Sequence, residues 1–459
     1  MTKRTAPSGR TAWPLLASWV LACDGGAAAQ AADAGGEGVN RLDVVEVVEA
    51  AEVADAAAAP VLTVSQPPTT APAGSDVVLS VQVTPAAAVA LEVSVRAGGG
   101  AAPSVTTDAA GRATVVWTLG VLPVLQRLRI ATETSEAEVT VEATRDQPLS
   151  SAPFGDVVAL LDAEGSTVST EDLVVVGDRV VMGAPGGLLE VSADGKATRR
   201  ALTGEPPKKG WGVAATGDAV WVVDLEEQRL VHVDSTGQAT TALSEMEAGL
   251  PFDGINDVEV GPDGAVFVTD PCLARIGRYD PPAKQVTDVL LFDASVDGGP
   301  NGMTFDADGR LYYSTENTSI LCGQPDVAAY DAKLARIERV TLEGATFGGR
   351  ELIAEGLGVF GDGLTMDVEG NLYAVIDQIA DLALAESAVW VFPGGRGPGQ
   401  RLVVAEGVLY ANVAFGRGAL GETTLYLALL AAPPFTGLDS RGLQRVEIGV
   451  SRAPWLSPL

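Results

Sequence analysis

Apolar and polar residues alternate at every second position in short runs along most of the chain beyond residue 60. Residues 77–83 and 91–95 show the alternation most clearly. This period is that of a β-strand that buries one face against a core. The 53 glycines and 27 prolines among 459 residues supply many turns, which favours short strands over long helices. The pattern therefore predicts an all-β protein.

Residues 60–146 contain about seven of these runs, separated by turns that are rich in Gly, Pro and Asp. This spacing is expected of an antiparallel β-sandwich. Residues 107–113, followed by 117–120, resemble a bacterial immunoglobulin-like repeat. We therefore predict an N-terminal immunoglobulin-like β-sandwich with Trp117 in its core. It carries no recognisable chemistry, which indicates a spacer or adhesion unit.

A longer unit recurs from residue 153 to about residue 450. It consists of an apolar strand, a tight turn with Asp and Gly, and a second strand rich in Val, Leu and Tyr. The units follow one another at roughly 40 to 60 residues, the length of a four-stranded propeller blade. The wide interval between the fourth and fifth units predicts an insertion in the fourth blade, within residues 316–333. The six first strands imply a six-bladed β-propeller, and they begin near Leu173, Val213, Val258, Met303, Leu364 and Val413.

The pattern of the N-terminal residues is typical of an export signal. Lys3, Arg4 and Arg10 precede an apolar stretch, residues 12–22, that is too short to span a bilayer but suits a signal peptide over residues 1–22. Residues 20–23 resemble a bacterial lipoprotein cleavage box, which predicts lipidation of Cys23; ordinary cleavage near residues 27–29 is the alternative. Residues 23–59, rich in Ala, Gly, Asp and Glu, predict a disordered tether. The expected product is an exported bacterial lipoprotein in the periplasm or on the cell surface, touching the membrane only through its lipid anchor.

The charge balance narrows the classes of partner. Sixty acidic residues against thirty basic ones give a formal net charge of −30, which excludes nucleic acid as a partner because phosphate binding needs clustered Lys and Arg. Self-repulsion at this charge favours a monomer that attracts cations. The single histidine, His232, excludes a two-His zinc site and disfavours a His-based triad.

Five motifs follow one another along the predicted blades. They are Glu171-Asp172-Leu173 with 185–187, Gly254-Ile255-Asn256-Asp257-Val258 with 267–271, Gly299-Pro300-Asn301-Gly302-Met303, Gly361-Asp362-Gly363-Leu364 with 370–373, and Asn412-Val413-Ala414-Phe415-Gly416. In this order they resemble the gluconolactonase and regucalcin (senescence marker protein) family of six-bladed propellers over about 300 residues. The resemblance implies the fold and the hydrolysis of lactones, with a small-molecule lactone or sugar-derived ligand as partner.

Four of these motif residues lie directly before first strands, and in a propeller such positions meet at one end of the central channel. Glu171, Asn256, Asn301 and Asp362 offer carboxylate and amide oxygens, which favours a hard cation, Ca²⁺ first, with Mg²⁺ or Mn²⁺ as alternatives. The resemblance implies that Glu171, Asn301 and Asp362 bind the metal and that Asn256 contacts metal and substrate. Calcium acidifies water weakly, so Asp362 is also the candidate catalytic base.

The three cysteines support export. If Cys23 takes a lipid, Cys272 and Cys322 remain as a pair in an oxidising compartment. Each follows the second strand of adjacent predicted blades, so we predict a disulfide that pins the fourth-blade insertion beside the channel mouth as a lid. Two free thiols are the alternative.

Other interpretations stay open at this point. Animal members of the family carry a substrate-contacting Arg where this chain has Gly254, and Asp172-Leu173 replaces their Gly-Pro. A non-catalytic surface propeller that binds a ligand is therefore the second hypothesis, and a metal-free propeller of the strictosidine-synthase type is the third. Asn301 and Asp362 are also common turn formers, and Glu171 is the type of loop residue that is usually solvated. Packing roles are expected of His232, Trp211, Trp221 and Trp390.

Overall fold

The structure is a computed structural model that describes residues 59–164, 171–318, 322, 334–380, 383–405, 408–430 and 441–454. The predicted signal peptide, Cys23 and the tether lie outside these residues, as does most of the predicted fourth-blade insertion. Strands make up 57% of the structure and helices 4%, so the all-β class is confirmed. None of the helices in these ranges is both long and apolar enough to span a bilayer.

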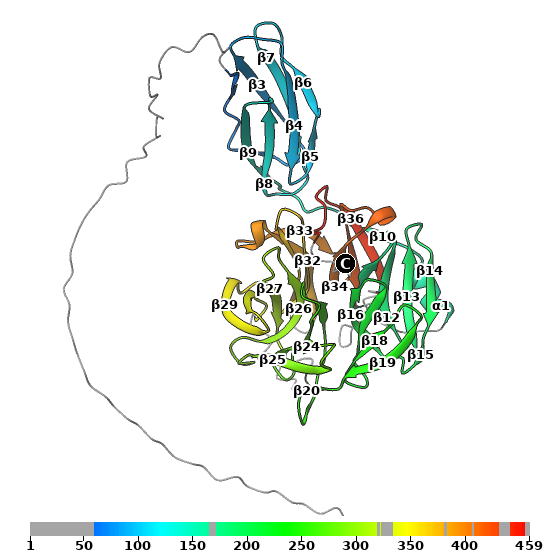
Figure 1. The fold of residues 1–459 in the computed structure, drawn as a ribbon. Helices are drawn as coiled ribbons and strands as arrows, with labels where there is room; N and C mark the ends of the chain where they lie inside the picture. The colour runs from blue at the N-terminus through cyan, green and yellow to red at the C-terminus, as the bar shows by residue number, and fades with distance from the viewer. Residues whose placement is uncertain are drawn as a thin grey trace, which may run out of the picture. The chain divides into compact units, whose positions relative to one another are not determined.

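Residues 61–144 form two packed sheets (Figure 1). Apolar side chains alternate between core and solvent along the long strands, and Trp117 is fully buried as predicted. The structure has nine strands where the sequence shows about seven runs, because three strands of three residues are too short to display a period. In sheet order, the first sheet is β1 (Val61–Val64), β3 (Asp76–Thr84), β7 (Arg112–Leu119), β5 (Gly99–Ala101), and the second is β2 (Thr70–Pro72), β9 (Glu136–Thr144), β8 (Leu125–Ala131), β4 (Ala90–Arg96), β6 (Ser104–Thr106).

From residue 152 onward the strands form six successive groups, each called a sheet below (Figure 1). Their strands are, sheet by sheet, β11 (Val174–Val176), β12 (Arg179–Ala184), β13 (Gly187–Ser192), β14 (Ala197–Ala201); β16 (Gly210–Thr216), β17 (Ala219–Asp224), β18 (Arg229–Val233), β19 (Gln238–Leu243), with the short β15 (Thr203–Gly204) added outside; β22 (Val258–Val260), β23 (Val266–Asp270), β24 (Arg275–Asp280), β25 (Gln285–Leu291); β26 (Gly299–Phe305), β27 (Leu311–Glu316), β28 (Ile337–Glu343), β29 (Thr346–Ala354); β30 (Phe360–Met366), β31 (Leu372–Ala380), β32 (Ala383–Phe392), β33 (Gln400–Ala405); and β34 (Tyr410–Phe415), β35 (Thr424–Leu429), β36 (Gly442–Glu447), β10 (Ala152–Phe154). The fourth and fifth groups are joined into one larger sheet by the pairing of β27 with β30. A separate two-stranded sheet consists of β20 (Glu245–Glu247) and β21 (Leu250–Pro251).

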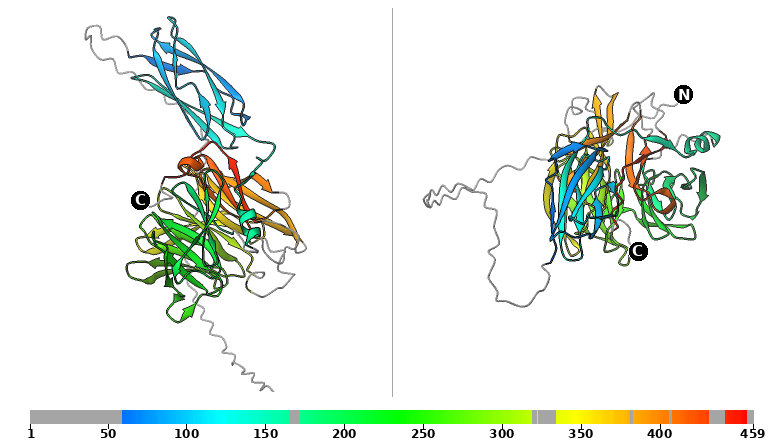
Figure 2. Two further views of the ribbon diagram at one scale, coloured as in Figure 1. Left: turned by 90° about the vertical axis from the view of Figure 1, so that its right-hand side faces the viewer. Right: turned by 90° about the horizontal axis from the view of Figure 1, so that it is seen from above.

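The first strands of the six sheets surround one cavity. Each of β11, β16, β22, β26, β30 and β34 contributes residues to a channel with a volume of about 90 Å³. These strands contact one another in sequence order, and β11 also contacts β34, which closes the ring. The sixth sheet takes its outer strand, β10, from the segment that precedes the first sheet. The only α-helix in the described ranges, α1 (Val157–Ala163), packs on β14 and β36 (Figure 2).

Four of the six inner strands carry a β-bulge at the same place. The pairing register shifts directly before Val213, Met303, Leu364 and Val413. These strands therefore begin three or four residues earlier than the sequence predicts, at Gly210, Gly299, Phe360 and Tyr410. The predicted start is the point where regular pairing resumes after the bulge. A bulge leaves residues unpaired and re-aims their side chains. Asn301 and Asp362 are both such bulge residues.

The glycine after each of these residues is required by packing against the next sheet. A Cβ on Gly302 would lie 2.4 Å from the Asp362 carbonyl oxygen, and one on Gly363 would lie 2.6 Å from Asn412 Cα. A Cβ on Gly212 would meet the Asn256 carbonyl oxygen at 2.4 Å in the same way. The Asn-Gly and Asp-Gly pairs therefore combine a polar side chain with a bulge that the neighbouring sheet can approach closely.

Replacing Gly302 by Ala is expected to lower the free energy of unfolding by about 1–3 kcal/mol, because overpacking at this point must displace backbone. Gly349 on β29 is the matched control, since nothing lies within 4 Å of a Cβ built on it. Urea unfolding of both variants measures the difference. Equal stability of Gly302→Ala and Gly349→Ala would contradict the role assigned to the bulge glycine.

Candidate functional site

The four residues proposed from sequence all lie at the starts of inner strands, on four different sheets. Glu171 stands three residues before β11 and Asn256 two residues before β22, whereas Asn301 and Asp362 lie inside β26 and β30. Their exposed fractions are 5%, 7%, 3% and 6%. Glu171 is thus buried rather than the solvated loop acid that its type and position permitted.

Unpaired oxygen atoms are concentrated among these residues. Glu171 Oε2, Asn256 Oδ1 and Asn301 Oδ1 are buried and have no hydrogen-bond partner. The only other side-chain oxygens of this kind in the described ranges are Glu316 Oε1 and Asp377 Oδ1. An unsatisfied buried polar atom costs about 1–3 kcal/mol, so five in one region are unfavourable unless a ligand satisfies them.

The negative charges of carboxylates from different sheets also raise one another's pKa values. Burial raises the pKa of Glu171 well above its usual range, and the charges of Asp362, Asp172, Asp257 and Glu316 raise it further. Burial likewise raises the pKa of Asp362, followed by the charges of Asp377, Glu316, Asp257 and Asp172. The charged groups that raise these two pKa values are all carboxylates.

Asp172 and Asp257 have a structural role that the sequence did not reveal. Asp172 Oδ2 accepts a hydrogen bond from the Val213 N–H of the second sheet. Asp257 Oδ2 accepts one from the Met303 N–H of the fourth sheet at 2.8 Å. Each carboxylate therefore ties its own sheet to the next one at the bulge. Asp172, which stands where the family usually has Gly, therefore forms a hydrogen bond that links two sheets.

Sequence reasoning missed Glu316 and Asp377. Glu316 is the last residue of β27 in the fourth sheet. Asp377 ends a buried stretch of β31 in the fifth sheet. Burial raises the pKa of each to about 8. Glu316 pairs with Phe360, which in turn pairs with Asp377, and this single bridge joins the fourth and fifth sheets. An acidic residue ending an apolar strand was the available signal.

The donor chemistry fits a hard divalent cation. Carboxylate and amide oxygens are the ligands that Ca²⁺ prefers, and the unpaired oxygens of Glu171, Asn256 and Asn301 are the atoms such an ion would satisfy. In the described part of the chain, no three His, Cys, Asp or Glu side chains form a metal-binding group by themselves. A cation site here therefore depends on the two asparagine amides as well as on Glu171 and Asp362.

None of the four residues lines the channel of about 90 Å³ that the inner strands enclose. The channel is formed by residues that follow them along the chain. Asp172, Asp257 and Asn412 line it, and so does Arg417, whose charge interacts with that of Glu422.

Cys272 and Cys322 form a disulfide, which confirms the predicted pair. Cys272 follows β23 and Cys322 follows β27, so the bond links the third and fourth sheets. A Cβ on Gly254 would lie 2.5 Å from Cys272 Sγ. The disulfide therefore occupies the space that any larger side chain at position 254 would need. The predicted lid lies largely outside the described residues and stays a prediction.

Reducing this disulfide is expected to lower the free energy of unfolding by about 4 kcal/mol, the chain-entropy value for a loop of this size; the two cysteines are 50 residues apart. Urea unfolding with and without a reductant measures the change. The double variant Cys272→Ala/Cys322→Ala serves as the control, because its stability should not respond to reductant. An equal response of both proteins would show that the bond does not stabilise the fold.

The aromatic residues considered earlier lie where packing accounts for them. Trp221 is buried, and its ring centroid lies 4.5 Å from that of His232. Trp390 is partly buried against the core of the fifth sheet. Trp211 is half-buried, with the Lys209 ammonium 4.5 Å from its ring centroid.

Residues 186–384 match the sequence model of the SMP-30/Gluconolactonase/LRE-like region. This part of the chain, which includes Asn256, Asn301 and Asp362, is therefore gluconolactonase-like. A gluconolactonase of Zymomonas mobilis is 26% identical over 183 residues, 37% of this chain. The matched segment spans about half, 49%, of that relative.

Two solved structures are similar at lower identity. A gluconolactonase from Xanthomonas campestris is 17% identical, with a TM-score of 0.44 over 66% of this chain and 98% of its own. A calcium-binding regucalcin from Agrobacterium tumefaciens is 19% identical, with a TM-score of 0.44 over 69% of this chain and 95% of its own.

Proposed function

We propose that this chain, gluconolactonase-like over residues 186–384, is an exported, calcium-dependent hydrolase of lactones or related esters. The observation that carries the proposal is the set of unpaired buried oxygens on Glu171, Asn256 and Asn301, together with the buried carboxylate of Asp362. We further propose that the six sheets form a closed six-bladed propeller and that the preceding sandwich is immunoglobulin-like. A lipid on Cys23 would anchor the protein in the periplasm or on the cell surface.

Glu171, Asn301 and Asp362 would hold the cation, and Asn256 would contact it too. A bound divalent cation polarises an ester carbonyl and offsets negative charge that develops on its oxygen. Asn256 keeps its amide N–H₂ group available to orient a substrate oxygen. Asp362 takes a proton from the attacking water and returns it to the ring oxygen as the ester C–O bond breaks. Burial raises the pKa of Asp362, which makes its carboxylate a stronger base than an exposed one.

The test is turnover of a lactone panel by the purified full chain. The panel contains glucono-δ-lactone, unsubstituted γ- and δ-lactones and an aryl ester, and acid release is followed with a pH indicator. We expect turnover that a chelator abolishes and added Ca²⁺ restores. Chelator-insensitive turnover, or a protein that binds no divalent cation, would refute the proposed mechanism.

A non-catalytic propeller that binds a ligand at the same mouth is the second candidate. The observation in its favour is Gly254, which lies against the Cys272 sulfur and presents no side chain to a substrate. This candidate predicts that calcium and lactone both bind while no acid is released. Calorimetry with the lactones that fail in the turnover assay distinguishes the two functions.

A further inference from the structure

Glu316 holds the side chain of Asn301 in one orientation. Asn301 Nδ2 donates a hydrogen bond to Glu316 Oε2 at 3.1 Å, and both residues are buried, with exposed fractions of 3% and 2%. The ionised form of Glu316, which a bound cation would require, can only accept, so the bond places the amide nitrogen toward Glu316. The amide oxygen, Asn301 Oδ1, then points elsewhere and has no partner.

The second oxygen of Glu316 has no partner either. Glu316 Oε1 is buried and unpaired, like the oxygens of the proposed cation site. The charge of Glu316 raises the pKa of Glu171, from the first sheet, and of Asp362, from the fifth. The carboxylate of Glu316 thus lies near Glu171 of the first sheet and near Asp362 of the fifth sheet.

The backbone around Glu316 fixes this position. Glu316 pairs with Phe360 at the junction of the fourth and fifth sheets. The Asn317 N–H donates to the Val359 carbonyl at 3.0 Å, and Ser314 Oγ donates to the Asp362 carbonyl at 2.8 Å. The strand that carries Glu316 is therefore tied to the bulge that carries Asp362.

We propose that Glu316 is a fifth member of the cation site, where it orients Asn301 and supplies Oε1 as an additional oxygen donor. The proposal rests on the cation site of the proposed function. It explains why a carboxylate is buried in an acidic region without a cationic side chain beside it: burying a charge is unfavourable unless an opposite charge or hydrogen bonds compensate it. It also makes the site more anionic than four ligands would, which favours divalent over monovalent ions.

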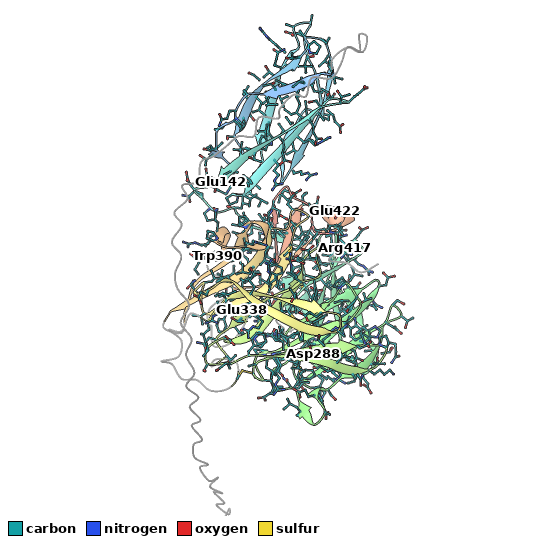
Figure 3. The ribbon with its side chains drawn as sticks, turned by 60° about the vertical axis from the view of Figure 1, so that its left-hand side comes forward. Glu142, Asp288, Glu338, Trp390, Arg417 and Glu422 are labelled. Carbon is teal, nitrogen blue, oxygen red and sulfur yellow. A yellow bond between two sulfur atoms is a disulfide. The ribbon has the colours of Figure 1, made fainter. Side chains whose placement is uncertain are left out.

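The experiment measures Ca²⁺ affinity of the chelator-treated full chain by calorimetry, with Tb³⁺ luminescence as a second probe. Glu316→Gln removes the charge, and Glu316→Ala removes the acceptor for Asn301 as well. We expect at least a tenfold loss of affinity in the first variant and a larger loss in the second, within the 10–100-fold range typical of groups that orient metal ligands. Glu338→Gln is the control, because Glu338 is a buried glutamate of the same sheet that pairs with Arg350 (Figure 3).

Thermal unfolding in chelator checks that each variant folds, and Glu316→Asp replaces any variant that does not. Affinity within twofold of the unmodified chain in Glu316→Gln and Glu316→Ala would overturn the proposal, provided that Asp362→Asn still loses binding. That pattern leaves the proposed function intact. Absence of Ca²⁺ binding by the unmodified chain would instead overturn the proposed function and this proposal together.

Discussion

Replacing Asp362 by Asn is expected to lower kcat/KM for a responsive lactone by about 100-fold or more and to stabilise the cation-free protein. The loss follows from removing the proposed general base and one proposed cation ligand, since positioned bases contribute about 10²–10⁴-fold. The gain in stability follows from the surroundings of Asp362, because burial and the charges of nearby carboxylates all oppose its ionisation. These carboxylates are Asp377, Glu316, Asp257 and Asp172. A neutral amide of the same shape removes that repulsion.

Activity and stability should therefore move in opposite directions in this variant. Turnover and the Tm in chelator at pH 8 are the two measurements, and the Tm is expected to rise by about 1–2 °C for each kcal/mol gained in a protein of this size. Asp308→Asn is the matched control: Asp308 lies in the turn at the other end of β26 and is exposed. Undiminished turnover in Asp362→Asn would remove Asp362 from the mechanism.

The stabilisation that Ca²⁺ gives is expected to grow as the pH rises from 5 to 8. Burial raises the pKa of Asp257 to about 7 and those of Glu316 and Asp377 to about 8. In this range the folded, cation-free protein keeps protons that the unfolded chain has already lost. Its stability therefore falls with rising pH, at about 1.4 kcal/mol per pH unit for each such proton.

Calcium must displace these protons before it binds, so its apparent affinity should rise by up to tenfold per pH unit for each proton released. At a concentration of about 100 times the Kd, a ligand adds about 2.7 kcal/mol of stability. Thermal unfolding at pH 5, 6, 7 and 8, with chelator or with excess Ca²⁺, gives both curves. We expect the two curves to diverge as the pH rises; curves that remain parallel would show that these carboxylates do not take part in cation binding.

The sequence predicted the strand-rich fold and the disulfide because both leave local traces. Val213, Met303, Leu364 and Val413 were identified as strand starts since apolar alternation resumes at these residues. The strands in fact begin three or four residues earlier, because a bulge interrupts pairing without interrupting the strand. The pair Cys272 and Cys322, which the structure joins, was predicted from the cysteine count together with the expected lipidation of Cys23.

The rest of the site depended on three-dimensional information. Asn301 was recognisable because Asn-Gly is a motif, whereas Glu316, its hydrogen-bond partner, ends an apolar strand and belongs to no motif. Which residue at a strand end faces the ring depends on the register with the neighbouring sheet, and that register is set by the bridge from Glu316 to Phe360. No pattern within one strand encodes such a contact.

The most direct test is an anomalous difference map from crystals of the full chain grown with Mn²⁺. The account predicts one strong peak among the first strands, with oxygen atoms of Glu171, Asn301 and Asp362 about 2.1–2.4 Å from it. An empty map, or these oxygens spread more than about 8 Å from any common point, which oxygen ligation at such distances does not tolerate, would contradict it.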